Sequence, residues 1–402
     1  MAPLELWIDV RQGGVTPEFF DLMIPYLQNT KVLGIDSGLT GREFAETLQK
    51  FLPTTPNLQS LSLFGDAGDA LLDWSNDSRG QSTPPLTYLY LSTIPLYHSF
   101  LRLTTLTNFT LYHSQFNLQL DTLLDFLAEN RSLEYAVLDI QFVHPSLRNS
   151  RCRVPIKNRL RSLSISSSCA MDVKALISKI AVQKGAHLTV GLFEWNAEST
   201  YIHTIVSMAH LLNLGSPTSM EYRPNECSIR TIRLLGPNGS FSLKRWSGTE
   251  ALFVEFPLLP LDDIRTFHLR DHVSNFGSLR RAPTVFPPLS FPSLETLAVE
   301  RETAVSHLLS AFFSNPASPR RLKTLGFFDC VLDEGFVKKL TRFSSNRKNT
   351  TSARLLRVAI VNSKGQLPTS TMINELGKHV PDVDVRVGKE LPPDLKWGGP
   401  VD

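Results

Sequence analysis

The chain contains 402 residues, of which 42% are hydrophobic and 20% are charged. This balance is typical of a globular protein with a large core, and it excludes an intrinsically disordered chain. The formal net charge of +3 is too small to indicate a polyanionic partner. It conceals an asymmetry, because residues 1–80 carry eleven acidic and five basic side chains, whereas residues 320–357 carry three acidic and ten basic ones.

The cysteines and the hydropathy pattern indicate the cellular compartment in which the protein is expected. Four widely spaced cysteines form no CxxC pair, which favours a reducing environment, and the first residues lack the pattern of a signal peptide. The longest apolar stretch, ALFVEFPLLPL, contains Glu255 and two prolines and is too short to cross a bilayer core of about 30 Å. We therefore expect a cytoplasmic or nuclear protein that does not contact membranes.

Short segments with strand periodicity alternate along the chain with segments of helical periodicity. Weak strands are expected in LELWIDV from Leu4 and VLGI from Val32, and DVDVRV forms another near the end. Between them a motif LxxLxL recurs, with its first residue at positions 58, 86, 106, 133, 160, 229, 264, 294, 322 and 355. The long gap after position 160 spans roughly two units and contains a weak strand, HLTVGLF. Helical periodicity appears in residues 16–27, 41–52, 120–130, 172–182 and 336–343.

This alternation predicts an α/β solenoid. Successive strands would pair in parallel about 4.8 Å apart, and the bulkier helices on the other side would force the stack to curve. We expect a horseshoe with a parallel sheet on the concave side and helices on the convex side. A (β/α)8 barrel would end after eight strands, which the number of motif copies exceeds. The expected organisation is one domain over residues 1–402 with about 12–13 irregular repeats, comprising weak repeats (1–57), clearer repeats (58–361) and a C-terminal cap (362–402).

One unit carries a complete known pattern. In RLKTLGFFDCVL, Leu322, Leu325, Phe327, Cys330 and Leu332 match LxxLxLxx(N/C)xL. The chain therefore resembles the leucine-rich-repeat proteins, and the cysteine type is similar to the class common in F-box substrate receptors. More narrowly, residues 16–27 and the closing segment 340–395 look similar to F-box-like proteins of mushroom-forming fungi. Other units depart from the pattern and carry serine at the Asn/Cys position, at residues 114 and 168.

The resemblance implies a non-enzymatic protein-binding domain, like the substrate-recognition part of a cullin-type ubiquitin ligase receptor. MAPLELWIDV mimics the opening phrase of an F-box, but the alternation of Leu4, Leu6, Ile8 and Val10 fits a strand better. We therefore expect the F-box to be missing, and a cullin-ligase adaptor to bind only if one lies upstream. Two alternatives remain open: a free-standing interaction or structural protein with no ligase link, and an enzyme of unknown class.

The search for chemistry finds few candidates. Asp262, Asp263, His268, Asp271 and His272 are of metal-binding types, but the strand periodicity turns His268 away from the core, so a polar strand and loop is the expected reading. The sequence contains no GxSxG, HExxH or phosphate-binding loop, and GPNGS reads as a turn. We expect no catalytic residue, cofactor or metal.

Three further features receive structural interpretations. His203 and His210 are expected on an exposed helix face, and Cys330 is expected to be a buried repeat residue with an inert sulfur. The basic run over residues 338–357 lacks aromatic stacking residues after Phe343, so nucleic acid is not expected as a partner. A solvated helix end followed by a loop is the predicted structure there.

The residues between the motif leucines would line the concave sheet, where we expect a protein substrate or partner to bind. The predicted binding residues are an aromatic stripe in the first half and a charged centre further on: Phe64, Tyr88, Tyr90, Tyr112, Tyr135, Arg233, His268, Arg270 and Glu300. Tyrosine and arginine on a rigid sheet dominate many interface hot spots. The alternative is that aromatic residues simply favour strands.

Overall fold

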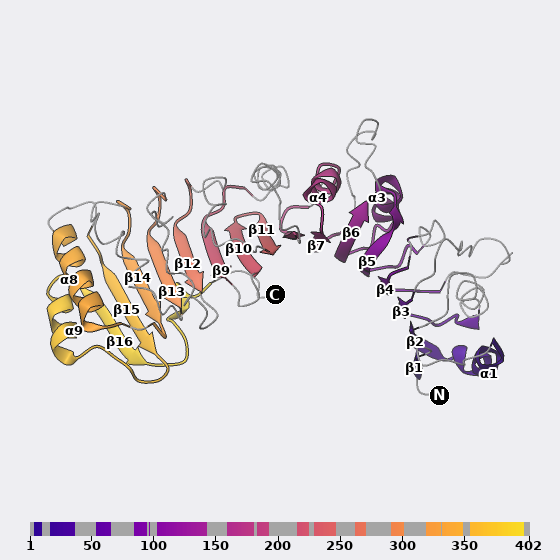
Figure 1. Cartoon of the computed structure of the whole chain (residues 1–402), viewed down its shortest axis with the longest axis horizontal. Coiled ribbons are helices and arrows are strands. Elements are labelled where there is room, and N and C mark those ends of the chain that lie inside the picture. The colour runs from indigo at the N-terminus through magenta and orange to yellow at the C-terminus, as the bar shows by residue number, and fades with distance from the viewer. Residues whose placement is uncertain are drawn as a thin grey trace. The chain divides into compact units, whose positions relative to one another are not determined.

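The computed structural model describes residues 4–9, 17–36, 54–65, 84–94, 96, 103–142, 159–180, 183–192, 215–224, 229–246, 262–270, 291–300, 319–330, 332–348 and 354–397. The chain divides into two compact units, Met1–Phe193 (unit 1) and Glu194–Asp402 (unit 2). Both have α/β architecture, and the sixteen described strands fall eight to each unit. Figure 1 labels the elements of both units.

Unit 1 contains a parallel sheet whose strands follow one another in chain order. The strands are β1 (Leu4–Asp9), β2 (Thr30–Asp36), β3 (Ser60–Phe64), β4 (Tyr88–Ser92), β5 (Asn108–Leu118), β6 (Tyr135–Phe142), β7 (Ser162–Ser167) and β8 (His187–Leu192). The described helices are α1 (Pro17–Leu27), α3 (Leu120–Glu129) and α4 (Ala170–Ile177). The predicted strands of this region are thus confirmed, including the weak one in HLTVGLF. The predicted helix at 41–52 lies outside the described residues.

The motif leucines form the core of unit 1 because the parallel register aligns them in rows. One buried row contains Leu33, Leu61, Leu89, Phe109, Ala136, Leu163 and Leu188. Helix α3 covers this side, where the ring of Phe126 lies 4.4 Å from that of Phe109. The Asp172 carboxylate in α4 accepts a hydrogen bond from the Phe142 backbone N–H at 3.0 Å, which ties this helix to β6.

Unit 2 contains a mixed sheet with the order β11-β10-β9-β12-β13-β14-β15-β16. Its strands are β9 (Ser219–Pro224), β10 (Ile229–Gly236), β11 (Gly239–Trp246), β12 (Thr266–Arg270), β13 (Thr296–Glu300), β14 (Thr324–Phe328), β15 (Arg357–Asn362) and β16 (Asp382–Val387). The described helices are α8 (Glu334–Lys348), α9 (Ser370–Gly377) and the 3-10 helix η6 (Pro393–Leu395). Strands β9 and β12 to β16 pair in parallel, whereas β9, β10 and β11 form an antiparallel meander.

The meander corrects one prediction. The motif copy at Ile229, Ile232 and Leu234 is not a parallel repeat strand but β10, the middle strand of the meander. The predicted turn explains the antiparallel pairing of β10 with β11, because GPNG closes a two-residue hairpin in which Gly236 pairs with Gly239. The parallel position beside β12 is taken instead by β9, whose sequence SMEYRP carries no LxxLxL motif.

The core of unit 2 repeats the arrangement of unit 1. Buried rows run through Met220, Phe267, Leu297, Leu325 and Val358, and through Tyr222, Leu269, Val299, Phe327 and Ile360. Helix α8 packs on this side, with Phe336 edge-on to Phe327 at 5.4 Å, and α9 lies next to α8 (Figure 1).

Two predicted features of this region have clear outcomes. Cys330 is buried, as predicted, and its sulfur lies 3.3 Å from the Val299 carbonyl oxygen. In the basic run, however, Arg347 is not solvated. It is fully buried and donates hydrogen bonds to the carbonyl oxygens of Pro319 and Leu322 at 3.2 and 3.1 Å. No described helix is long and apolar enough to cross a membrane.

Candidate functional site

The outward face of the unit 1 sheet is built by the residues that alternate with the core leucines. The register places them in rows across neighbouring strands. The first row contains Glu5, Val32, Ser60, Tyr88, Asn108, Tyr135, Ser162 and His187. The second contains Trp7, Gly34, Ser62, Tyr90, Thr110, Val137, Ser164 and Thr189, and the third contains Asp9, Asp36, Phe64, Ser92 and Tyr112. We call Trp7, Phe64, Tyr88, Tyr90, Tyr112 and Tyr135 the aromatic face.

The aromatic face is continuous across several strands. The Phe64 ring lies 4.8 Å from that of Tyr90 and 6.5 Å from that of Trp7, with both pairs tilted. Trp7 remains 62% exposed, and Tyr112 and Tyr135 are each 42% exposed. All five aromatic residues predicted from the sequence therefore lie on one sheet face. Whether this face binds a partner remains a prediction.

Trp7 was missed by the sequence reasoning, and its position depends on a glycine. An ideal Cβ at Gly34 would lie only 2.2 Å from the Trp7 Cε3 atom, so the indole rests directly on the Gly34 backbone. The signal was present in LELWIDV, where Trp7 occupies the alternation position that faces away from Ile8. Gly34 thus provides the space that lets Trp7 extend the aromatic face across β2.

The central tyrosine of this face is partly shielded from water. Burial raises the pKa of the Tyr90 hydroxyl; a hydrogen bond with Ser92 opposes the rise, and the nearby Tyr112 and Tyr88 add to it. The phenol therefore stays protonated well above neutral pH and retains its hydrogen-bond donor. An apolar ring with a polar tip suits a surface that contacts a protein partner.

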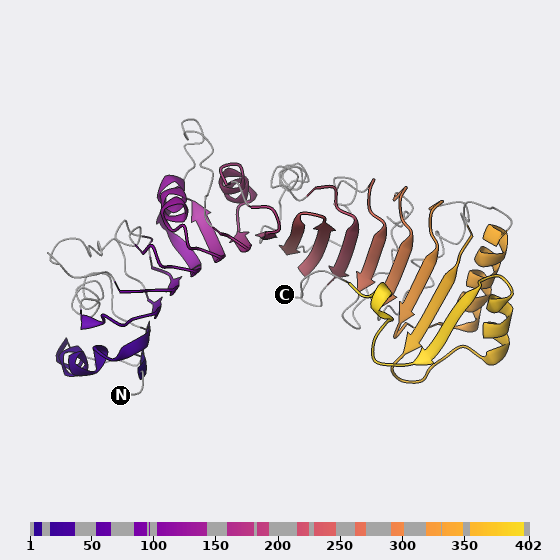
Figure 2. The same cartoon turned by 180° about the vertical axis from the view of Figure 1, so that it is seen from behind.

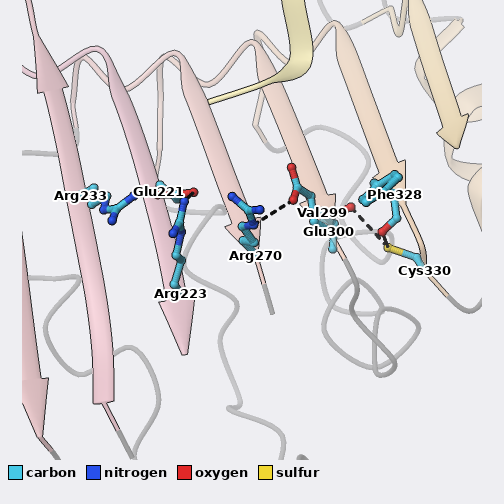
Figure 3. A network of polar contacts seen from close by, with 8 residues as sticks. All are labelled: Glu221, Arg223, Arg233, Arg270, Val299, Glu300, Phe328 and Cys330. Atoms are coloured by element: carbon cyan, nitrogen blue, oxygen red, sulfur yellow. Dashed lines mark hydrogen bonds and ion pairs between the residues drawn. The ribbon is translucent and has the colours of Figure 1, made fainter. Parts of the chain in front are cut away.

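The predicted charged centre lies on the corresponding face of unit 2, as Figure 3 shows. Glu221, only 1% exposed, accepts from Arg233 Nη1 at 3.1 Å and lies 2.8 Å from Arg223 Nη2. One strand further, Arg270 pairs with Glu300 at 3.1 Å. Glu221 and Arg223 were not predicted, because β9 carries no repeat motif. The Glu221 carboxylate is thus paired with two guanidinium groups, which a buried carboxylate requires.

Part of the unit 2 face, over strands β12 to β15, is covered by the chain's own residues 388–397, here called the C-terminal segment. Figure 2 shows its short helix η6 on the near side of the strands. Leu391 and Leu395 are buried in one cluster with four residues of the sheet, Ala298, Phe328, Ala359 and Val361. A Cβ at Gly326 would lie 3.1 Å from Leu395 Cδ1, so small residues on the strands make room for the segment.

Polar and aromatic contacts hold the segment in place. Asp394 accepts from Arg357 Nη1 at 2.5 Å, and the Trp397 ring stands edge-on to His268 at 6.0 Å. His268 is consequently 2% exposed, and burial, with Arg270 and Arg223 adding to the effect, lowers its pKa to about 4. The predicted binding residue His268 is therefore not exposed on this face. His268 is neutral at pH 7 and lies beneath Trp397 rather than at the surface.

The structure gives little support for other kinds of site. Among the described residues, no group of three or more His, Cys, Asp or Glu side chains could hold a metal ion. Asp271 and His272, and likewise His203 and His210, lie outside the described residues.

Comparisons with known proteins do not assign this chain to a family. No known protein family matches this sequence, and no curated protein is significantly similar to it. The function must therefore be inferred from the two sheet faces themselves.

Proposed function

We propose that this chain is a non-enzymatic interaction protein that binds another protein through the aromatic face of unit 1. One observation carries the proposal: Trp7, Phe64 and Tyr90 form a chain of neighbouring rings on a face that no described segment covers. Tryptophan and tyrosine bury large areas with little loss of side-chain freedom, and they are enriched at interface hot spots. Contiguous exposed apolar patches are uncommon on monomers without a binding role.

The contrast between the two units supports this reading. The same alternation produces an outward sheet face in both, but in unit 2 the C-terminal segment buries Leu391 and Leu395 against it. In unit 2, a face built by this alternation thus packs against a short segment that contains a 3-10 helix. On unit 1, Tyr112, Tyr135 and Val137 remain substantially exposed, which leaves area for a partner.

We also propose the finer architecture, a leucine-rich-repeat solenoid. In it, the sheet faces that point away from the leucine core would lie on the concave side. The parallel order of successive strands and the complete pattern ending at Cys330 and Leu332 support it. On this basis the chain would correspond to the substrate-recognition part of an F-box receptor. A free-standing repeat protein is the alternative. Copurification with a cullin-ligase adaptor, or its failure, separates the two.

The experiment compares partner recovery by the intact chain and by a Tyr88→Ala/Tyr90→Ala variant. Quantitative affinity purification should show at least tenfold loss of specific partners for the variant, because hot-spot truncations cost about 2 kcal/mol or more. Tyr26→Ala is the matched control, since Tyr26 is exposed on α1, away from the aromatic face. Equal recovery by the double variant and the control, with unchanged thermal unfolding, would refute the proposal.

A further inference from the structure

Rings and polar side chains alternate along the first row of the unit 1 face. Strands β4 to β8 follow one another as neighbours in the sheet. Across them, the first row contains Tyr88, Asn108, Tyr135, Ser162 and His187. A ring therefore lies on every second strand, with an amide or a hydroxyl between successive rings, and none of these five residues is buried. The third row repeats the alternation, with Phe64 and Tyr112 on either side of Ser92.

The spacing of these rings fits one extended conformation of a peptide. Neighbouring strands lie about 4.8 Å apart, so rings on every second strand repeat about every 9.6 Å. A polyproline II helix rises about 3.1 Å per residue with three residues per turn, so equivalent residues recur about every 9.3 Å. By comparison, one face of a β-strand repeats about every 6.7 Å, and two turns of an α-helix cover about 10.8 Å. A polyproline II helix that crosses the strands therefore matches the rings best.

The polar residues between the rings suit the backbone of such a helix. A polyproline II helix forms no internal hydrogen bonds, and each proline offers a carbonyl oxygen but no N–H donor. Thr107 donates a hydrogen bond to Asn108 Oδ1 at 2.8 Å, and no described residue accepts a hydrogen bond from Asn108 Nδ2. Over β4 to β8 the first row also contains no Asp, Glu, Lys or Arg. The row thus combines hydrogen-bond donors with the absence of ionised carboxylates, guanidinium and ammonium groups, which matches an uncharged segment.

We propose that the partner of the aromatic face is a proline-rich protein segment that crosses strands β4 to β8 as a polyproline II helix. The inference rests on the proposed function and specifies its partner class. Prolines three residues apart contact Tyr88 and Tyr135, because grooves lined by aromatic rings receive prolines at this spacing. Asn108, between the two rings, donates to a backbone carbonyl of the segment. A polyproline II helix is ordered before it binds, so little conformational entropy is lost.

The test selects peptides that need the first row. A displayed library of random 12-residue peptides is selected on the full chain and counter-selected on Tyr135→Ala. Tyr135 is 42% exposed, so its truncation should leave the sheet folded. If Tyr135→Ala lowers the thermal-unfolding temperature, Tyr135→Thr takes its place, because threonine favours strands. We expect Pro-x-x-Pro in the peptides that remain, and remaining peptides without this spacing overturn the proposal.

Synthetic copies of the selected peptides, titrated by fluorescence anisotropy, test the spacing and the donor. Inserting one alanine between the two prolines moves the second one by about 3.1 Å and should weaken binding at least tenfold. Asn108→Asp keeps the shape of the side chain but removes its donors, and should weaken binding about five- to tenfold. Tyr26→Ala, on α1, should leave the affinity unchanged. Equal affinity for the original and the lengthened peptide, or for wild type and Asn108→Asp, overturns the proposal.

The failure of this inference is distinguishable from the failure of the proposed function. Partner recovery can depend on Tyr88 and Tyr90 while the selected peptides lack Pro-x-x-Pro or do not depend on Tyr135. In that case the partner class fails and the proposed function stands. If partner recovery does not depend on Tyr88 and Tyr90, the proposed function fails and this inference fails with it.

Discussion

Replacing Leu395 with alanine should release the C-terminal segment from unit 2 without unfolding the sheet. Leu395 is 1% exposed and sits in the apolar cluster formed with Leu391, Ala298 and Ala359. The segment follows β16 directly and its described residues form no strand of the sheet, so it can detach while the strands beneath it remain paired. Local opening of this kind costs less free energy than global unfolding.

The magnitude follows from the loss of a fully buried leucine side chain. Leu→Ala in a protein core costs about 2–5 kcal/mol, and the low end applies here because a short segment can settle against the sheet. A loss of about 2 kcal/mol shifts the docking equilibrium roughly 30-fold toward the detached state. The loss cannot exceed the docking free energy itself, since a detached segment no longer contacts the sheet.

Hydrogen exchange and trypsin measure this opening. Exchange of the backbone amides in residues 388–397 should accelerate roughly 30-fold in Leu395→Ala, because exchange tracks the open population when reclosing is fast. Cleavage after Lys389 and Lys396 should accelerate in parallel. Leu356→Ala is the matched control, since Leu356 is an exposed leucine of the same unit. Exchange and cleavage rates equal to those of the control would refute the assigned role of Leu395.

Three further predictions concern single residues. Burial lowers the pKa of His268 to about 4 from an ordinary value near 6.5, so the unfolded state binds a proton at a higher pH than the folded state does. The free energy of unfolding should therefore be highest above pH 6.5, fall by about 2 kcal/mol by pH 5 and stop falling below pH 4. His268→Gln should abolish this dependence in urea unfolding. Gly34→Ala should displace the Trp7 indole and lower the recovery of partners that bind the aromatic face about tenfold, and unchanged recovery would contradict the packing described. Arg347→Met should lower the free energy of unfolding by about 2–4 kcal/mol, because two carbonyl oxygens lose their donor, whereas the exposed Arg342→Met should stay within about 0.5 kcal/mol.

Strand positions were predictable wherever the leucine alternation is strong. Leu61, Leu89 and Leu163 had to face the core, and a shift of one residue would have exposed them, so periodicity determines both the strand and its register. The α8 helix was recognisable for the same reason, from the spacing of Phe336, Leu340 and Phe343.

The meander and the covered face were not predictable in this way. β9 has only Met220 and Tyr222 facing the core, too short a pattern to distinguish from a loop. The docking of the C-terminal segment depends on small residues in three separate strands, such as Gly326, and their significance appears only once the strands are side by side. Partner residues remote in sequence likewise decide that Arg347 is buried.

The C-terminal segment also determines which ligands unit 2 can accept. Because it is tethered at Val387, immediately after β16, its effective local concentration is on the order of millimolar, as for a short flexible linker. An external peptide making the same contacts must outcompete that internal rival, so weak ligands would leave this surface unoccupied. The C-terminal segment thus occupies part of the unit 2 face, whereas among the described residues no segment lies on the aromatic face of unit 1.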